Sequence, residues 1–120
     1  MNKIMVVDDD KDLLANVKAF IRKRGYDVVV ATSCKEGMDI LHSFKPDLIF
    51  MDINVGDDDG REMCRSIKGQ VEFLYMPVIL ISANHEALKE YQDYGANASI
   101  NKPFPFSDLA AIIGQYLSAA

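Results

Sequence analysis

The sequence contains few cysteines and no long apolar run. Its 120 residues include two cysteines, Cys34 and Cys64, which are too few for a disulfide framework or a zinc site. No stretch approaches the roughly 20 consecutive apolar residues that a membrane-spanning helix needs. The first residues pass directly into a strand-like run, so we expect no signal peptide. These absences predict a cytoplasmic protein with reduced thiols and no contact with membranes.

Basic residues are outnumbered by acidic ones. The 13 Lys and Arg residues stand against 18 Asp and Glu residues, which gives a net charge of −5. Direct binding of nucleic acid would need a basic stripe, so this composition argues against it. The residues that are present, 49% hydrophobic and 26% charged, are typical of a folded domain with its own core. We expect a single domain over residues 1–120.

Short apolar runs alternate along the chain with amphipathic segments. The runs have the length of strands buried on both faces, and the segments have apolar residues at helical spacing. This alternation predicts a parallel sheet covered by helices on both faces. Asp10 or Asp12 would cap the first helix, and Thr32 or Ser33 the second. The expected strands are residues 3–7, 27–31, 47–52, 76–82 and 99–101, and the expected helices are residues 12–24, 33–44, 61–68, 84–94 and 106–117.

Polar side chains stand at the carboxyl ends of four expected strands. In a parallel sheet these ends share one edge, which is where ligands bind in open α/β folds. Three of the residues are aspartates, and carboxylates gathered in one pocket repel one another unless a cation lies among them. The residues are Asp8 and Asp9 after the first strand, Asp52 and then Asn54 at the third, Ser82 at the fourth and Lys102 after the fifth.

The residue types in this set suit phosphoryl transfer. Carboxylate oxygens with open positions suit Mg²⁺, which completes its shell with water and a phosphoryl oxygen. A lysine and a hydroxyl at the same edge could hold two further phosphoryl oxygens. Taken singly, Asp8-Asp9 also suits a helix N-terminus, and Ser82 a helix cap. Together the residues predict a metal, a carboxylate nucleophile, a cation and a hydrogen-bond donor at one site.

Short motifs extend this pattern along essentially the whole chain. They are Val6-Val7-Asp8-Asp9, Gly25-Tyr26-Asp27-Val28, Pro46-Asp47-Leu48-Ile49 before Asp52, Asp59-Gly60, Pro77-Val78-Ile79 before Ser82-Ala83, Gly95-Ala96 and Lys102-Pro103-Phe104. In this order and spacing they resemble the receiver domain of response regulators, of the chemotaxis type, in two-component signalling. The resemblance implies a flavodoxin-like, doubly wound parallel sheet with strand order 2-1-3-4-5 and five flanking helices.

The resemblance also implies that Asp52 is the phosphoacceptor of a signalling domain rather than part of an enzyme. It would take the phosphoryl group from the phosphohistidine of a sensor histidine kinase or a histidine phosphotransfer protein. Ser82 would donate a hydrogen bond to that group, and Lys102 would pair with it. Ala83, a small residue beside the acceptor, would leave room for the donor. Phosphorylation would then switch contacts with an unknown downstream protein.

A magnesium site is implied by the same resemblance, with Mn²⁺ as an alternative ion. Asp9 would bind the ion directly, and Asp8 partly through water. Asp52 and the backbone carbonyl of Asn54 would supply the other protein ligands. The side chains at Asn54 and Asn84 would set the rate of a slow self-dephosphorylation.

Two positions depart from the family pattern. Gly56 stands where the family often has proline, which predicts a more flexible loop without contact to a catalytic group. Ser99 stands where the family commonly has a Tyr or Phe that follows the hydroxyl residue inward on phosphorylation. Because Ser99 has no ring to bury, we expect the signal to leave through the loop after Ser82 and the start of the next helix.

Other functions fit the residues less well. A phosphatase of the haloacid-dehalogenase type usually has a second Asp two residues after its nucleophile, and here that residue is Asn54. A calcium loop starting at Asp52 would need Gly sixth and Glu twelfth, where the chain has Asp57 and Met63. A receiver that only binds proteins would not need the complete set Asp8, Asp9, Asp52, Ser82 and Lys102. The run Asp57–Asp59 is interpreted as a solvated turn that also starts the third helix.

Overall fold

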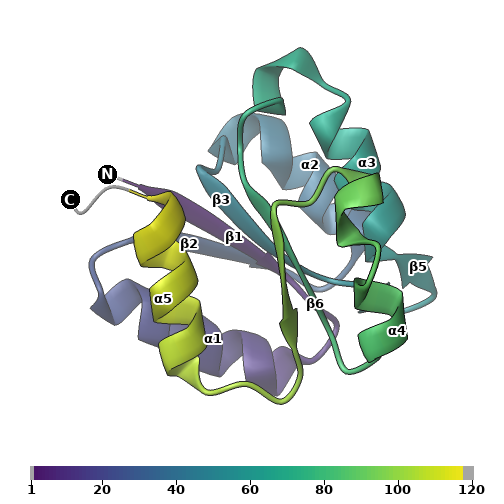
Figure 1. Ribbon diagram of the computed structural model, residues 1–120. Coiled ribbons are helices and arrows are strands. Elements are labelled where there is room, and N and C mark those ends of the chain that lie inside the picture. Colours follow the sequence, from purple (N-terminus) through teal and green to yellow (C-terminus); the bar gives the residue numbers. More distant parts are fainter. Residues whose placement is uncertain (1, 118–120) are drawn as a thin grey trace.

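The computed structural model describes residues 2–117 and contains one five-stranded sheet between two layers of helices (Figure 1). The strands lie in the order β2-β1-β3-β6-β7, and every adjacent pair is parallel. Counting only these five strands, this is the predicted order 2-1-3-4-5, and the predicted fold is confirmed. The strands are β1 (Lys3–Val7), β2 (Asp27–Ala31), β3 (Leu48–Asp52), β6 (Val78–Ser82) and β7 (Ala98–Asn101).

Helices cover both faces of the sheet because successive strand residues point to opposite sides. Phe50 of β3 lies in the apolar cluster beneath α1 and α5, whereas Met51 lies in the cluster beneath α2, α3 and α4. Every residue of β3 is buried, which is why this run is apolar until Asp52. The helices are α1 (Lys11–Lys23), α2 (Cys34–Phe44), α3 (Gly60–Lys68), α4 (His85–Leu88) and α5 (Phe106–Tyr116).

Side-chain caps fix where the helices begin. Asp10 caps α1 by accepting a hydrogen bond from a backbone N–H of its first turn, and Ser33 caps α2 in the same way. The structure thus selects Asp10 and Ser33 from the two pairs of predicted caps. Asp59 and Asn84 cap α3 and α4. Since Asp10 and Asn84 follow strands of the sheet, these caps also shape the loops at its carboxyl edge.

The helix expected over residues 84–94 is broken into two short pieces. Residues His85–Leu88 form α4, and Tyr91–Tyr94 form the 3₁₀ helix η2. Leu88 is the buried side chain of this stretch, so there is too little apolar surface to hold a longer helix. Tyr94 is instead held from α3, where the guanidinium groups of Arg61 and Arg65 lie 5.3 Å and 4.5 Å from its ring centre.

Two small elements were not predicted from the sequence. Asn54–Val55 (β4) and Asp58–Asp59 (β5) form an antiparallel hairpin, with Gly56 at φ +60° in its turn. The run Asp57–Asp59 is therefore more than a solvated turn, because it contributes a strand and the cap of α3. A 3₁₀ helix, η1 (Val71–Phe73), joins α3 to β6.

None of the helices could reach across a bilayer. The longest, α1, has 13 residues, and within residues 2–117 no helix combines the length and the apolar character of a membrane span. Both cysteines are free thiols, with Cys34 half-buried at the start of α2 and Cys64 fully buried in α3. Burial raises the pKa of the Cys64 thiol to about 11, so this residue packs as a neutral apolar side chain.

Candidate functional site

Three carboxylates meet at the carboxyl edge of the sheet. Asp8 and Asp9 follow β1, and Asp52 is the last residue of β3. Because β1 and β3 are adjacent and parallel, one carboxylate oxygen from each of the three residues lies within 4.8 Å of the other two. Asp8 and Asp52 are 3% and 6% exposed, while Asp9 is open to solvent. The pocket is thus buried on the strand side and accessible from the loop side.

Lys102 enters this pocket from the segment after β7. Its ammonium nitrogen lies 2.7 Å from Asp52 Oδ2 and 2.8 Å from Asp8 Oδ2, and it donates hydrogen bonds to both. Three carboxylates and one ammonium leave a formal charge of −2, which is the charge that one divalent cation would balance. The donor set is composed of oxygens alone, as hard ions such as Mg²⁺ prefer. The residues present therefore fit a magnesium ion.

Burial and charge act on the pKa values of this cluster in opposite directions. Burial raises the pKa of the Asp8 carboxyl, and the nearby Asp52 adds to the rise, although hydrogen bonds from Lys102 and the Asp10 amide oppose it. Burial would lower the pKa of Lys102, but its hydrogen bonds to Asp52 and Asp8 outweigh burial and the pKa rises. Lys102 is thus held in its charged form, and a further cation beside Asp8 would stabilise the ionised form of its carboxyl group.

Backbone amides orient each of the three carboxylates. Asp8 Oδ1 accepts a hydrogen bond from the Asp10 amide at 2.9 Å, and Asp52 Oδ1 accepts one from the Asn54 amide at 3.0 Å. Asp9 Oδ2 accepts one from the Gly56 amide at 3.0 Å. The prediction that the Gly56 loop touches no catalytic group was therefore wrong. Any residue except proline supplies such an N–H, so residue identity gave a signal only at Gly56, where the family often has proline.

Gly60, the first residue of α3, packs directly against the backbone of Asp52. A β carbon at position 60 would overlap the carbonyl oxygen of Asp52. The Gly60 amide also donates a 2.7 Å hydrogen bond to the carbonyl of Ile53. The sequence showed Asp59-Gly60 as a matching motif and a helix start. The structure supplies the physical reason, because α3 can begin this close to the acceptor strand only without a side chain.

Of the remaining predicted residues, Ser82 and Ala83 lie at the carboxyl edge of the sheet, whereas Ser99 lies away from the carboxylates. Ser82 is fully buried at the end of β6, next to β3, and its hydroxyl accepts a 3.0 Å hydrogen bond from the Asn84 amide. Ala83 and Lys102 line a cavity of about 300 Å³ at the same edge. Ser99 lies inside β7 opposite Leu80, on the border of two surface cavities of about 310 and 430 Å³. Ser99 is thus close to α4 and α5 rather than to the carboxylates.

Comparisons with known proteins agree with the fold. The family model of the response regulator receiver domain matches residues 4–114. The chain is similar in structure to chemotaxis protein CheY4 of Vibrio cholerae, with 24% identity, a TM-score of 0.90, and coverage of 98% of this chain and 99% of that one. It is also similar to the BeF₃-activated N-terminal receiver domain of RstA from Klebsiella pneumoniae, with 28% identity, a TM-score of 0.87 and coverage of 98% and 99%. A third similar structure is the signal receiver domain of a signal transduction histidine kinase from Syntrophus aciditrophicus, with 28% identity, a TM-score of 0.88 and coverage of 98% and 91%.

Proposed function

Because this chain belongs to the response regulator receiver family, we propose that it accepts a phosphoryl group from a histidine onto Asp52. The donor is a sensor histidine kinase or a histidine phosphotransfer protein. The observation that carries the proposal is the position of Asp52, which ends the buried central strand within hydrogen-bond distance of Lys102 and beside Asp8 and Asp9. The chain acts as a signalling domain that is phosphorylated, not as an enzyme with a separate substrate.

Mg²⁺ is the cofactor that this pocket favours, with Mn²⁺ as an alternative. Asp8, Asp9 and Asp52 would hold it together with the backbone carbonyl of Asn54, and the formal charge of −2 among the acidic and basic groups supports a divalent ion. When bound, the ion supplies positive charge against the phosphoryl oxygens. Asp9 is the exposed member of the three, so it is the carboxylate that an arriving ion meets first.

Four groups of the chain have separate roles in the transfer. A carboxylate oxygen of Asp52 forms a bond to phosphorus as the P–N bond of the phosphohistidine breaks, and the imidazole nitrogen keeps the electron pair of that bond. The Asn54 amide fixes the rotation of the Asp52 carboxylate during this step. Lys102 neutralises charge on the phosphoryl group, and the Ser82 hydroxyl donates a hydrogen bond to it.

The signal leaves the site through Ser82 and α4. In the resting state the Ser82 hydroxyl accepts a hydrogen bond from the Asn84 amide, and Asn84 caps α4. A phosphoryl group that draws Ser82 towards Asp52 breaks this contact and loosens the cap. Since α4 has four residues and one buried side chain, little free energy opposes its movement. This path supplies a readout that does not need an aromatic side chain at Ser99.

Asn54 follows the acceptor by two residues and Asn84 follows Ser82 by two, and their side chains set the rate at which water removes the phosphoryl group. A downstream protein binds with different affinity to α4 when its Asn84 cap is intact and when that cap is loosened. The cytoplasm is the compartment that suits this reaction and the two free thiols, Cys34 and Cys64.

Intact mass spectrometry tests the proposal. The protein is incubated with Mg²⁺ and a small acyl-phosphate donor, beside Asp52→Asn and a sample with a chelator. Asp47→Asn is a matched control, because it changes a carboxylate that directly precedes β3, whereas Asp52 ends this strand. One added phosphoryl group is expected in the protein and in the Asp47→Asn variant, and none in the other two samples. If no mass is added, beryllofluoride binding separates a short-lived phosphoryl group from a protein without this activity, and failure of both measurements contradicts the proposal.

A further inference from the structure

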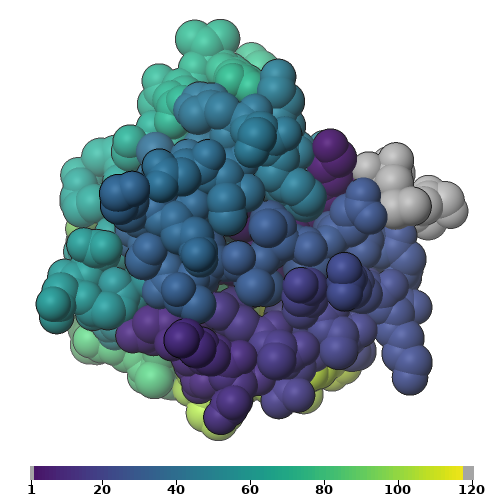
Figure 2. Space-filling model, turned by 180° about the vertical axis from the view of Figure 1, so that it is seen from behind, coloured from purple at the N-terminus to yellow at the C-terminus, as the bar shows by residue number. Residues whose placement is uncertain are grey.

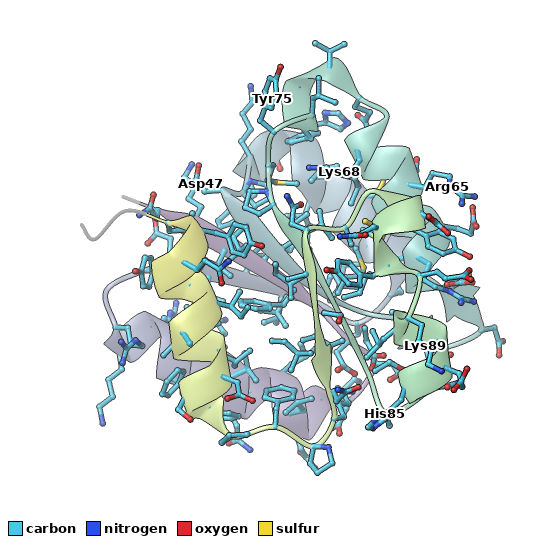
Figure 3. The ribbon with its side chains drawn as sticks, in the orientation of Figure 1. Asp47, Arg65, Lys68, Tyr75, His85 and Lys89 are labelled. Atoms are coloured by element: carbon cyan, nitrogen blue, oxygen red, sulfur yellow. The ribbon has the colours of Figure 1, made fainter. Side chains whose placement is uncertain are left out.

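The large apolar side chains that are exposed in residues 2–117 gather in one short segment. Val71 is 90% exposed, Leu74 48% and Tyr75 91%. This segment forms the top of the molecule in Figure 2, and Figure 3 shows Tyr75 at the opposite end from His85 and the carboxyl edge of the sheet. An exposed apolar patch of a few hundred Å² on a soluble protein commonly marks an interaction site.

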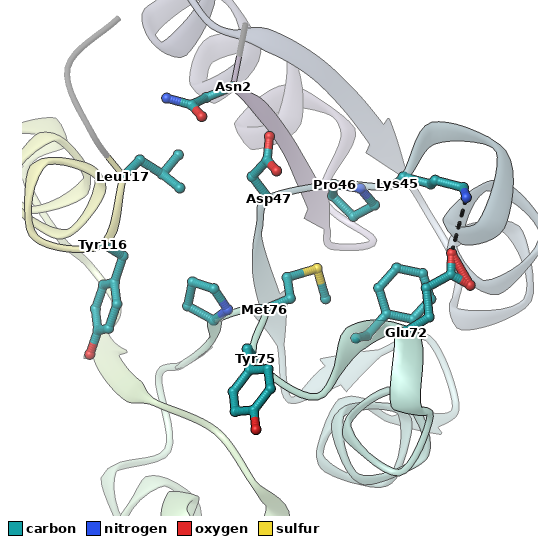
Figure 4. A pocket seen from close by; sticks show the side chains of 11 residues that line it. Asn2, Lys45, Pro46, Asp47, Glu72, Tyr75, Met76, Tyr116 and Leu117 are labelled. Carbon is teal, nitrogen blue, oxygen red and sulfur yellow. Dashed lines mark ion pairs between the residues drawn. The ribbon is translucent and has the colours of Figure 1, made fainter.

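A cavity of about 490 Å³ lies directly beside this segment, at the amino ends of the strands. Tyr75 forms part of its wall and yet projects almost fully into solvent. In Figure 4, Tyr116 and Leu117 lie on one side of the cavity, the Lys45–Glu72 pair lies on the other, and Tyr75 lies between them. We name this cavity and the side chains of Val71, Leu74 and Tyr75 the distal patch. The other lining residues are Asn2, Pro46, Asp47, Phe73, Met76 and Pro77.

Folding alone does not account for the apolar residues of the distal patch. The segment is anchored by Phe73, which is 3% exposed, and by backbone hydrogen bonds such as that from the Phe73 amide to Gln70. Val71 and Tyr75 contribute almost no buried area, so polar residues at these two positions would fold equally well. Their apolar character therefore suits contact with another molecule.

We propose that the distal patch binds the distal patch of a second copy of this chain in a two-fold dimer. A two-fold interface brings the same surface of both copies together, so that surface must offer both a projection and a recess. The distal patch has the two side by side, because the Tyr75 ring projects next to a cavity that is large enough for an aromatic side chain. Each Tyr75 thus inserts into the cavity of the other copy.

The charges around the distal patch favour a second copy over a highly charged partner. The whole chain has a net charge of −5, which opposes self-association in general. Around the patch, however, the charges cancel. The Lys45 ammonium lies 3.4 Å from the Glu72 carboxylate. Lys3 holds Asp47 through its backbone N–H, while its ammonium lies 3.3 Å from the Phe44 carbonyl oxygen. Two basic and two acidic residues therefore lie around each distal patch, so its formal charge is zero and a second copy would meet no local net repulsion.

Sedimentation velocity over a concentration series tests this dimer in the unphosphorylated protein. We expect a dimer whose fraction grows with concentration. Tyr75→Ser should weaken it at least about tenfold in Kd, because a central tyrosine commonly dominates such an interface. Tyr75→Phe keeps the ring and should leave the Kd within about threefold, given a hydroxyl that is already exposed. Neither variant alters a buried residue, so both should fold.

Charge reversal at the rim provides an independent measurement. Lys45→Glu adds like charges to both copies, so it should weaken the dimer and make its Kd sensitive to salt, unlike that of the unchanged protein. Asp52→Asn should leave the Kd unchanged, which keeps the result separate from the proposed phosphorylation. A protein that stays monomeric throughout, or a dimer that survives Tyr75→Ser, overturns the proposal.

Discussion

Gly60→Ala is a small change with a large expected effect at the acceptor site. Gly60 is the first residue of α3, and its φ is not in the left-handed region, so alanine would ordinarily suit the helix better than glycine. The added β carbon, however, would overlap the carbonyl oxygen of Asp52. To remove the overlap, α3 must move away from β3, or the backbone of Asp52 must shift.

The expected cost follows from these contacts. Overpacking costs about 1–3 kcal/mol. The 2.7 Å hydrogen bond from the Gly60 amide to Ile53 would also be strained, which adds about 1 kcal/mol. Against these stands a gain of about 0.5–1 kcal/mol in helix propensity. The net loss of unfolding free energy is about 1–3.5 kcal/mol, or roughly 5–15 °C in Tm for a domain of this size.

Urea denaturation and the rate of phosphorylation by a small donor measure the two consequences. We expect the rate of Gly60→Ala to fall about 100-fold, because the attacking carboxylate is misplaced by about 1 Å. Gly114→Ala in α5 is the matched control, since nothing lies within 4 Å of the added β carbon. It should stabilise the protein by about 0.5 kcal/mol and leave the rate unchanged. A Gly60→Ala variant as stable and active as the unchanged protein would refute the reasoning.

Three further predictions concern the pKa of Asp8, the metal site and η2. Burial raises the pKa of Asp8 above its ordinary value of 3.8. The free energy of unfolding should therefore fall as the pH rises from 3.8 through the raised pKa, because the unfolded chain loses this proton more readily. In thermal melts at a series of pH values, Asp8→Asn should remove this fall. Mg²⁺ should raise the Tm at pH 7, and Asp9→Asn should reduce that shift. Tyr94→Ala should cost about 1 kcal/mol in urea denaturation by removing the ring beneath Arg61 and Arg65, whereas Tyr94→Phe should cost little.

The sheet could be predicted from the sequence because its signals are strong and local. The run Leu48–Asp52 is buried on both faces, and its shortness between turn signals favours a central strand over a buried helix. The position of the polar side chains followed from the same argument, since parallel strands place their carboxyl ends at one edge. The convergence of Asp8, Asp9 and Asp52 therefore needed no knowledge of distances.

What the sequence did not predict depends on weak propensity or on tertiary contact. The β4–β5 hairpin has Gly56-Asp57 as its two-residue turn, and such a turn is a recognised hairpin signal. The hairpin was nevertheless not predicted, because Asp58 and Asp59 have low strand propensity. The chain leaves the helical conformation after α4 because Leu88 is the buried side chain of that stretch. The apolar residues of the stretch stand at helical spacing, so the sequence pattern alone did not indicate this break. The exposure of Val71 and Tyr75 could not be predicted either, because an apolar residue in a sequence gives no sign of whether anything covers it.

The acceptor site and the distal patch occupy opposite ends of the parallel strands, and this separation has a consequence for valency. A five-residue strand spans about 16 Å. Two copies joined through their distal patches would therefore present their acceptor aspartates outward, in opposite directions and roughly 30 Å or more apart. Such a pair is bivalent, because neither acceptor shields the other. A receptor with two suitably spaced recognition modules would bind the second copy as an intramolecular event, and its avidity would depend on how many copies are phosphorylated.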